Sequence, residues 1–298
     1  MSVVPSLEVE RALEGDAAVV ALETSVVAQG LPSPRNLECV ERMTAAVRAS
    51  GAVPAWTGVV DGEVRVGLED EVLSAFAEPG RAAKVARRDL SGALATGGLG
   101  ATTVSSTIWA AAALSIPLAA TGGIGGVHPG TGDVSADLAE LSRSRILLVC
   151  SGPKSIVDPV ATAERLEELG VALVGYATDR MPFFLALDAG VELDQRVDDP
   201  ASAGALVRAM WELPSPGAVL LCNPIPSEHA MDAGEVAAAV RGCGEAATLN
   251  GVRGKALTPF LLSCVAERTG GASLEANLAL LEANARLAGE VAVAASVV

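Results

Sequence analysis

Aromatic residues and positive charges are scarce in this sequence. Aromatic residues make up 3% of the chain, and 36 acidic residues against 21 Lys and Arg leave a net charge of −15. Proteins that bind nucleic acids neutralise phosphates with Lys and Arg, so this charge argues against a nucleic-acid partner. It leaves room for a single phosphate group held in a local pocket.

Histidine and cysteine are also rare. Two histidines in 298 residues argue against a zinc site, which takes His and Cys ligands. The cysteines are scattered and form no C-x-x-C pair, and this pattern predicts buried free thiols in a reducing cytosol. They are Cys39, Cys150, Cys222, Cys243 and Cys264.

Neither a leader nor a membrane span is evident. No basic segment followed by an apolar one opens the chain, so we expect no signal peptide. Residues 90–132 carry no formal charge, but Gly and Pro interrupt this run and Thr and Ser are spread through it, which argues against a transmembrane helix. We therefore expect a cytoplasmic protein with no membrane partner.

Apolar strand-like segments alternate with helix-like segments, and this order predicts an α/β fold. The chain is long enough to bury a large core without a disulfide or a metal ion. A buried strand over 17–24 precedes a helix that Pro34 opens and that runs to about Ala49. Residues 53–60 and 64–68, joined by an Asp-Gly turn, predict a β-hairpin.

Residues 116–154 concentrate the chemistry. Two apolar strands, IPLAA and ILLVC, flank the segment TGGIGGVHPGTG and the acidic helix start DVSADLAEL, and SGPKSIVD follows the second strand. Ligands of open α/β sheets bind beyond the carboxyl ends of the strands, so we interpret this stretch as the active site. Common nucleotide motifs do not match, because His128 stands where the dinucleotide fingerprint needs glycine and Thr131 where the P-loop needs lysine.

Asp133 and Asp137 lie four residues apart at the predicted helix start, which places both on one helix face. Like charges at this spacing repel each other unless a positive charge lies near them. The helix dipole could provide that charge, in which case the pair is structural. A hard divalent cation, Mn²⁺ or Mg²⁺, held by carboxylate and water is the functional alternative.

Two charged residues stand at or just beyond the ends of predicted strands. Lys154 follows ILLVCSGP, among small apolar neighbours. Burial disfavours the charged form of an amine and makes lysine a nucleophile that forms Schiff bases. Glu23, at the end of the strand over 17–24, is either a catalytic group or a partner for a helix N-terminus.

Three further segments supply candidate ligand contacts. The basic cluster KVARRDL is either a solvated face or a source of cations for an anionic substrate. Residues 98–115 predict a buried helix whose glycine-rich start brings N–H groups to an anion or allows close helix–sheet packing. Asn277 and Asn284 interrupt the apolar face of the last predicted helix, and each either caps a loop or binds a planar amide ligand.

Taken in order, these segments resemble the pseudouridine-5′-phosphate glycosidase family, which includes indigoidine synthase A-like proteins. The resemblance covers nearly the whole chain. The motifs that carry it are ALETSVVAQGLPSPRN, GAVPAWTGVVDGEVRVGL, KVARRDL, GLGATTVSSTIW, ATGGIGGVHPGTGDVSADLAEL, CSGPKSIVD, LVGYATDRMPFF, NPIP, GKALTPFLL and SLEANLALLEANA.

The resemblance implies a single domain over residues 1–298, with a three-layer α/β/α fold, a mostly parallel central sheet and a small β-hairpin unit. It implies reversible cleavage of the C–C glycosidic bond of pseudouridine 5′-phosphate to uracil and ribose 5-phosphate, in pseudouridine catabolism, by an enzyme of the carbon–oxygen hydro-lyase class. The implied mechanism passes through a lysine imine of ring-opened ribose. The implied cofactor is one Mn²⁺ per subunit, and the implied assembly is a homotrimer.

The resemblance also assigns roles to residues. Lys154 corresponds to the nucleophile, Glu23 to the proton donor and Asp133 to the manganese position. His128 is expected at the phosphate and Asn277 at the base. The full set of implied substrate contacts and pocket residues is Lys84, Val104, Ser135, Ala136, Asp137, Thr121, His128 and Asn277.

Some positions depart from the family pattern. The loop between His128 and Asp133 is shorter than is usual in the family. Gln29 replaces a histidine, Pro153 an alanine and Ala283 an asparagine. The implied charged site residues are all present, so we expect an active enzyme. Two alternatives stay open: lysine-imine chemistry on another C-nucleotide or phosphosugar, and a non-catalytic ligand-binding homologue.

Overall fold

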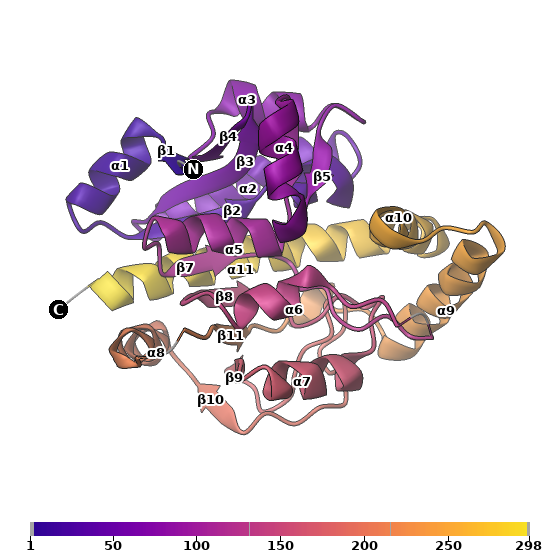
Figure 1. Ribbon diagram of the computed structural model, residues 1–298. Coiled ribbons are helices and arrows are strands. Elements are labelled where there is room, and N and C mark those ends of the chain that lie inside the picture. Colours follow the sequence, from indigo (N-terminus) through magenta and orange to yellow (C-terminus); the bar gives the residue numbers. More distant parts are fainter. Residues whose placement is uncertain (1–2, 131, 215, 297–298) are drawn as a thin grey trace.

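The structure is a computed structural model and describes residues 3–130, 132–214 and 216–296. The strands of its eleven-stranded sheet are β1 (Val3–Pro5), β2 (Val19–Glu23), β3 (Val53–Val60), β4 (Glu63–Val66), β5 (Ala83–Val85), β6 (Leu99–Thr102), β7 (Leu118–Ala120), β8 (Leu147–Cys150), β9 (Ala172–Tyr176), β10 (Gln195–Val197) and β11 (Val219–Cys222). The main order is β1-β4-β3-β2-β7-β8-β11-β9-β10, with β6 paired to β3 and β5 (Figure 1). Every neighbouring pair from β3 through β2 to β10 is parallel.

Helices connect the strands. They are α1 (Leu7–Glu14), α2 (Arg35–Ala49), α3 (Asp70–Phe76), α4 (Leu90–Thr96), α5 (Val104–Ala113), α6 (Ala136–Leu141), α7 (Pro159–Glu168), α8 (Pro200–Glu212), α9 (Ala233–Leu249), α10 (Leu257–Arg268) and α11 (Ala272–Ser296), with short turns η1 (Val26–Gly30), η2 (Arg87–Asp89), η3 (Ser227–His229) and η4 (Gly254–Ala256). Among the described residues, no helix is both long enough and apolar enough to cross a membrane.

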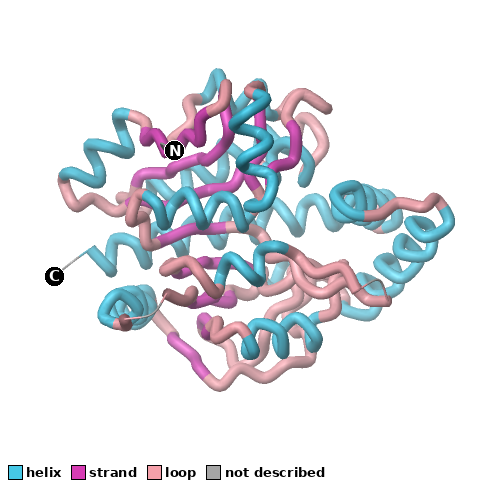
Figure 2. The backbone as a smooth tube through the Cα atoms, in the orientation of Figure 1, coloured by secondary structure: helices cyan, strands magenta, loops and turns pink. Residues whose placement is uncertain are grey.

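Side chains of each central strand alternate between two apolar cores. In β2, Val20 and Leu22 face the core formed with α2, α8 and α11, whereas Val19 and Ala21 face the core formed with α1, α5, α6 and α7. This period-2 alternation buries both faces of a parallel sheet. Helices therefore cover the sheet on both sides (Figure 2), which confirms the predicted three-layer α/β/α fold with a mostly parallel sheet.

The predicted β-hairpin is confirmed: β3 and β4 pair antiparallel, joined by Asp61 and Gly62, both at positive φ. The prediction of a helix over 98–115 is wrong at its start, because residues 99–102 form β6, which pairs with β3. Gly100 permits this pairing: a Cβ there would lie 2.8 Å from Val85 Cγ2. Helix α5 begins only at Val104.

Helices α9 and α10 form an arm at one side of the molecule (Figure 1) and are joined by a disulfide between Cys243 and Cys264. The prediction that every cysteine is a free thiol is therefore wrong for this pair. The two cysteines lie 21 residues apart, on helices that only the tertiary fold brings together. Closing a loop of this length stabilises the folded state by about 3 kcal/mol. Cys39, Cys150 and Cys222 are free and buried, as predicted.

Alkylation of the denatured protein should count these thiols. Without a reductant, iodoacetamide should label Cys39, Cys150 and Cys222 only, because the disulfide protects the other two cysteines. Reduction before labelling should add Cys243 and Cys264, and peptide mass spectrometry should locate both additions. Labelling of Cys243 or Cys264 in the non-reduced sample would contradict the disulfide.

Candidate active site

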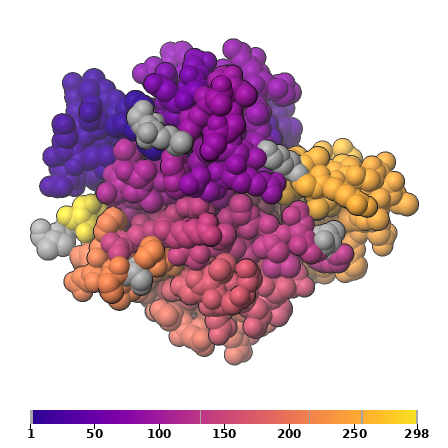
Figure 3. Space-filling view, viewed as in Figure 1, coloured from indigo at the N-terminus to yellow at the C-terminus, as the bar shows by residue number. Residues whose placement is uncertain are grey.

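A cavity of about 450 Å³ lies at the carboxyl edge of the parallel strands. The loops after β2, β7 and β8 line one side of it, and residues of α10 and α11 line another. In the space-filling view, the orange and yellow α9–α10 arm projects beside the magenta middle of the chain (Figure 3). The structure brings every sequence-predicted site residue to this cavity: Glu23, Lys84, Val104, Thr121, His128, Asp133, Ser135, Ala136, Asp137, Lys154 and Asn277.

Glu23 is the last residue of β2 and is buried. The hydroxyls of Ser25 and Thr121 both donate hydrogen bonds to its carboxylate oxygens. Thr121 directly follows β7, the parallel neighbour of β2, so the sheet itself brings this hydroxyl to the carboxylate. These two hydroxyls fix the position of the Glu23 carboxylate in the cavity.

Lys154 lies in a turn that interlocks with the glycine-rich segment. Its backbone N–H donates to the carbonyl of Ile124 at 2.9 Å, and the N–H of Ile124 donates to the carbonyl of Gly152 at 3.1 Å. Gly152 has φ +72°, and a Cβ there would lie 2.0 Å from the carbonyl oxygen of Pro182. The Lys154 side chain is partly exposed in the cavity, and no described residue forms a salt bridge or side-chain hydrogen bond with its amine. That amine is available to react.

The glycines at positions 122, 123, 125 and 126 let neighbouring segments pack closely against this part of the chain. None of them has a positive φ, in contrast to a loop that bends freely around a phosphate. A Cβ on Gly125 would lie 2.4 Å from Ser135 Oγ, and one on Gly126 would lie 2.2 Å from Thr162 Oγ1. The absence of side chains therefore lets the start of α6 and the start of α7 approach this segment.

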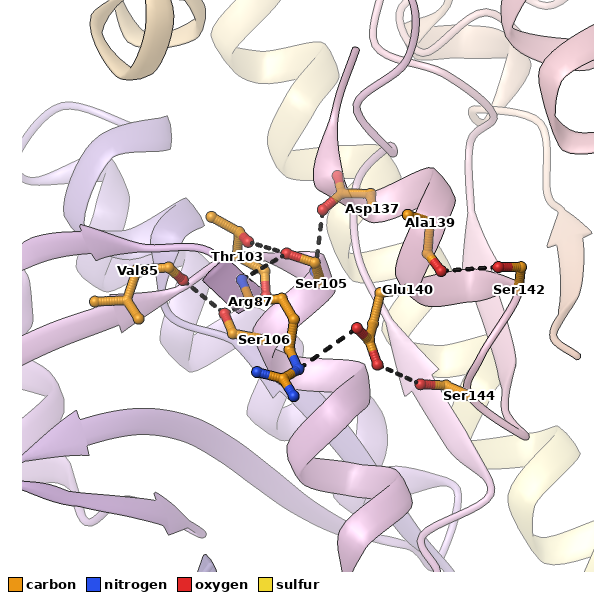
Figure 4. Close-up of polar contacts among 10 residues, drawn as sticks. All are labelled: Val85, Arg87, Thr103, Ser105, Ser106, Asp137, Ala139, Glu140, Ser142 and Ser144. Carbon is orange, nitrogen blue, oxygen red and sulfur yellow. Dashed lines mark hydrogen bonds and ion pairs between the residues drawn. The ribbon is translucent and has the colours of Figure 1, made fainter. Parts of the chain in front are cut away.

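Asp137 joins the glycine-rich segment to the start of α5. Its Oδ2 accepts the N–H of Gly125 at 2.9 Å. Its Oδ1 accepts the N–H of Ser105 at 3.0 Å (Figure 4). The carboxylate is buried and thus has a structural task besides any contact with substrate. The prediction that Asp133 and Asp137 share one helix face is wrong, because α6 begins at Ala136 and Asp133 lies in the loop before it.

His128 lies near the negative charge of Asp133 and the positive charges of Lys84 and Lys154. Its backbone N–H donates to the carbonyl of Asp133 at 2.9 Å, which closes the short loop between them. Burial lowers the pKa of His128, the charge of Asp133 opposes this effect, and the charges of Lys84 and Lys154 add to it. The imidazole is therefore neutral at neutral pH. Thr131, within the same loop, lies outside the described residues.

The basic cluster KVARRDL divides between two surroundings. Lys84 and Arg88 line the cavity. Arg87 instead stacks on Trp109, with its guanidinium carbon 4.7 Å from the ring centre, and its Nε lies 3.6 Å from Glu140 Oε2 (Figure 4). Burial raises the pKa of Glu140. Two cations of the cluster are thus placed to meet an anionic ligand, and the third belongs to the packing of α5.

The two asparagines of α11 have different surroundings. Asn284 is fully buried and bonds the loops after β7 and β8, as the capping hypothesis predicts. Asn277 lines the cavity, and its Oδ1 has no hydrogen-bond partner among the described residues. A buried amide oxygen without a partner costs free energy that a donor on a ligand can recover. Asn277 therefore fits the ligand-binding alternative.

Several lining residues have no counterpart in the sequence-based predictions. The rarity of lysine is a signal in the sequence that points to the cavity: the chain has three lysines, and two of them, Lys84 and Lys154, line it. The residues of α10 could not be placed, because only its tertiary packing brings this helix to the sheet edge. The missed lining residues include Ser25, Gln29, Phe184, Thr258, Pro259 and Leu262.

The residue types at the cavity fit a hard cation that keeps water among its ligands. They do not fit a metal ion that is held by protein groups alone. Among the described residues, no group of three or more His, Cys, Asp or Glu side chains gathers as a metal cage. Asp133 is an exposed carboxylate beside the loop of His128. Mg²⁺ commonly takes one or two carboxylates, with water and substrate phosphate as its other ligands. One exposed carboxylate at the cavity suits such a cation.

Replacing Asp137 by Ala should lower the free energy of unfolding by about 2–5 kcal/mol, because two buried N–H groups lose their acceptor. Urea denaturation of the purified variant measures the change. Asp232→Ala is the matched control, since it removes a carboxylate that accepts one N–H at the start of α9, and it should cost about 1 kcal/mol. Equal losses in the two variants would contradict the structural task of Asp137.

Comparisons with known proteins agree over nearly the whole chain. Residues 8–294 match the family model described as indigoidine synthase A like protein. A pseudouridine-5′-phosphate glycosidase of Gemmatimonas aurantiaca is 50% identical over 284 residues, covering 95% of this chain and 93% of the relative. The protein of the same name from Sorangium cellulosum is 46% identical over 295 residues, covering 98% and 93%.

Two crystal structures share the fold. The prealnumycin C-glycosynthase AlnA in complex with ribulose 5-phosphate superposes with a TM-score of 0.90 at 38% identity, covering 99% of this chain and 98% of that one. An indigoidine synthase A-like protein from Thermotoga maritima gives 0.89 at 37% identity, covering 98% and 96%. The chain therefore belongs to the indigoidine synthase A-like family, and its relatives include proteins named pseudouridine-5′-phosphate glycosidase.

Proposed function

We propose that this protein is a pseudouridine-5′-phosphate glycosidase that reversibly cleaves its substrate to uracil and ribose 5-phosphate. The observation that carries the proposal is the presence in one cavity of the Lys154 amine, which no described residue pairs with, and the Glu23 carboxylate, which two hydroxyls bond. The cavity volume of about 450 Å³ suits a nucleotide-sized ligand. Relatives named for this activity at 46–50% identity support the choice of substrate.

The bond to be broken explains why an amine is needed. It joins ribose C1′ to carbon 5 of uracil, so the leaving group has no glycosidic oxygen that a carboxylic acid could protonate. When the ribose ring opens, the C1′–O4′ electron pair passes to O4′, which takes a proton, and electrons of the uracil ring form a C5–C1′ double bond. The amine of Lys154 then adds to C1′, the electrons of the C5–C1′ double bond return to the uracil ring, and the proton that the nitrogen loses passes to Glu23.

Cleavage follows from this adduct. Glu23, once protonated, gives its proton to C5 of uracil. The C1′–C5 electron pair stays with the uracil ring, and the nitrogen lone pair of Lys154 forms the C1′–N double bond. Water hydrolyses this imine, which releases ribose 5-phosphate and restores the amine. The net reaction consumes one water, and each step can run in reverse.

Binding groups lie at several places around this centre. Lys84 and His128 are proposed to hold the phosphate, because both line the cavity and Lys84 lies near enough for its charge to lower the pKa of His128. Asn277 is proposed to bind uracil through its unpartnered oxygen. Val104, at the start of α5, and Ser135, at the start of α6, are proposed further substrate contacts. Ala136, Asp137 and Thr121 complete the proposed set.

One Mn²⁺ per subunit belongs to the proposal, with Asp133 as its protein ligand. The ion would neutralise phosphate charge and help to orient the substrate. The exposed position of Asp133 beside His128 supports this assignment. A cytoplasmic homotrimer, expected from the family resemblance, is likewise part of the proposal.

A second candidate function is lysine-imine chemistry on another C-nucleotide or phosphosugar. The 38% identity to a C-glycosynthase solved with ribulose 5-phosphate favours it, since that name denotes formation of a C–C glycosidic bond. The higher identity to proteins named pseudouridine-5′-phosphate glycosidase favours the first candidate. Turnover of several phosphorylated C-nucleosides in parallel separates the two.

Borohydride trapping should capture the imine. Incubation with pseudouridine 5′-phosphate and Mn²⁺, followed by borohydride, should leave a ribose phosphate adduct on Lys154 and release uracil. Lys154→Ala should lower the turnover rate by at least about a thousandfold and abolish the adduct. Lys84→Ala, which removes the other described cavity lysine, should raise KM and keep the adduct on Lys154. An adduct confined to Lys84, or rapid turnover by Lys154→Ala, would overturn the mechanism.

Removal of metal should slow the reaction. Treatment with EDTA should lower the rate of uracil release several-fold or more, and added Mn²⁺ should restore it, because the phosphate charge is otherwise unbalanced. Asp133→Asn should need more Mn²⁺ for the same rate and should bind less Mn²⁺ by the electron paramagnetic resonance signal of the free ion. Full activity in the presence of EDTA would remove Mn²⁺ from the proposal.

A further inference from the structure

Asn284 lies in the middle of α11, fully buried beneath the carboxyl ends of the central strands. Its Nδ2 lies 2.9 Å from the carbonyl oxygen of Thr121, 3.3 Å from that of Gly122 and 3.1 Å from Ser151 Oγ. Its Oδ1 accepts a hydrogen bond from Asn223 Nδ2 at 2.9 Å. One side chain thus contacts three segments that lie far apart in the sequence.

These contacts begin where the sheet ends. Thr121, Ser151 and Asn223 each directly follow a parallel strand, β7, β8 or β11. Sheet-like backbone hydrogen bonds continue to this level, as in Ser151 N–H to the carbonyl of Gly122 at 2.8 Å. Beyond it the regular strands end, and a bridge between Ile124 and Pro153 continues the pairing of the segments after β7 and β8, which line the cavity. Asn284 links these two segments to Asn223 at the level where the regular strands end.

Both reactive groups of the proposed mechanism are connected to this point. Thr121, whose carbonyl oxygen Asn284 holds, donates its hydroxyl hydrogen bond to Glu23. On the other side, Ser151 leads through Gly152 and Pro153 to Lys154. Asn284 does not line the cavity, so its influence on the reaction passes through these residues.

An amide at this position is not needed to pack the helix. Its buried neighbours on α11 include Leu280, Leu281 and Leu287, and an apolar side chain would bury as much surface. Burying an amide costs free energy unless every polar atom is bonded, and here both are. We propose that Asn284 is a positioning residue that sets the distance and orientation of the Glu23 carboxylate relative to the Lys154 amine.

The catalytic readout rests on the proposed function. Asn284→Asp keeps the shape but loses the donor to Thr121 and Gly122, and kcat for uracil release should fall by about 10- to 100-fold with a smaller change in KM. Asn284→Ser, which keeps a hydroxyl donor and is the milder variant should the Asp variant fail to fold, should lose less.

Two comparisons separate positioning from stability. Val291→Ala removes buried apolar atoms two turns further along α11 and should lower the urea midpoint while leaving kcat unchanged. Combining Asn284→Asp with Thr121→Val should lower kcat by less than the product of the two single losses, because part of the effect of Asn284 passes through the Thr121 hydroxyl. Additive losses of kcat, or an equal loss in Val291→Ala, would overturn the proposal.

Hydrogen exchange tests the same proposal without substrate. Backbone amides of residues 121–124 and 151–154 should exchange faster in Asn284→Asp than in Val291→Ala at equal global stability. Unchanged exchange at these amides would overturn the positioning role, whatever the enzyme does with pseudouridine 5′-phosphate. Absence of uracil release by the unmodified protein would instead reject the proposed function, and the exchange result would still decide the role of Asn284.

Discussion

The parallel register of β2, β7 and β8 is the constraint on which the site depends. It pairs Leu22 with Ala120 and Ala120 with Val149, so the three strands end at the same level. Glu23 and Thr121 then follow as neighbours on one face of the sheet, which is why the hydroxyl of one reaches the carboxylate of the other. A slip of one residue would turn Glu23 to the opposite face. The acid is therefore positioned by sheet pairing and not by loop conformation.

Local pattern was enough to predict the elements that carry their own signals. The strand over 17–24, the hairpin and the helix opened by Pro34 each have a turn residue or a continuous apolar run. The strands β1, β5 and β10 were not predicted, since each has three residues and exists only through its partner. Residues 99–102 were taken for helix because small apolar residues suit either state, and pairing with β3 decides between them.

The position of the site followed from strand ends and family motifs, but its internal bonds did not. Asp137 and Ser105 lie 32 residues apart in sequence, and no local pattern announces that a carboxylate will accept that N–H. The wall formed by α10 depends equally on contacts between distant segments. The disulfide that joins α10 to α9 could not be inferred, because its two cysteines have no recognisable spacing in the sequence. Sequence therefore identified which residues meet, and the structure identified which groups hold them.

The partners of Glu23 and Asp137, the buried carboxylates that line the cavity, distinguish their tasks. Asp137 accepts hydrogen bonds from two backbone N–H groups, which can only donate. Glu23 accepts two hydroxyls, and a hydroxyl can rotate to accept a hydrogen bond when the carboxyl group gains a proton. The surroundings of Glu23 thus accommodate both protonation states with little movement. A residue that must take up and release a proton in each cycle needs this property, and a residue that fastens two loops together does not.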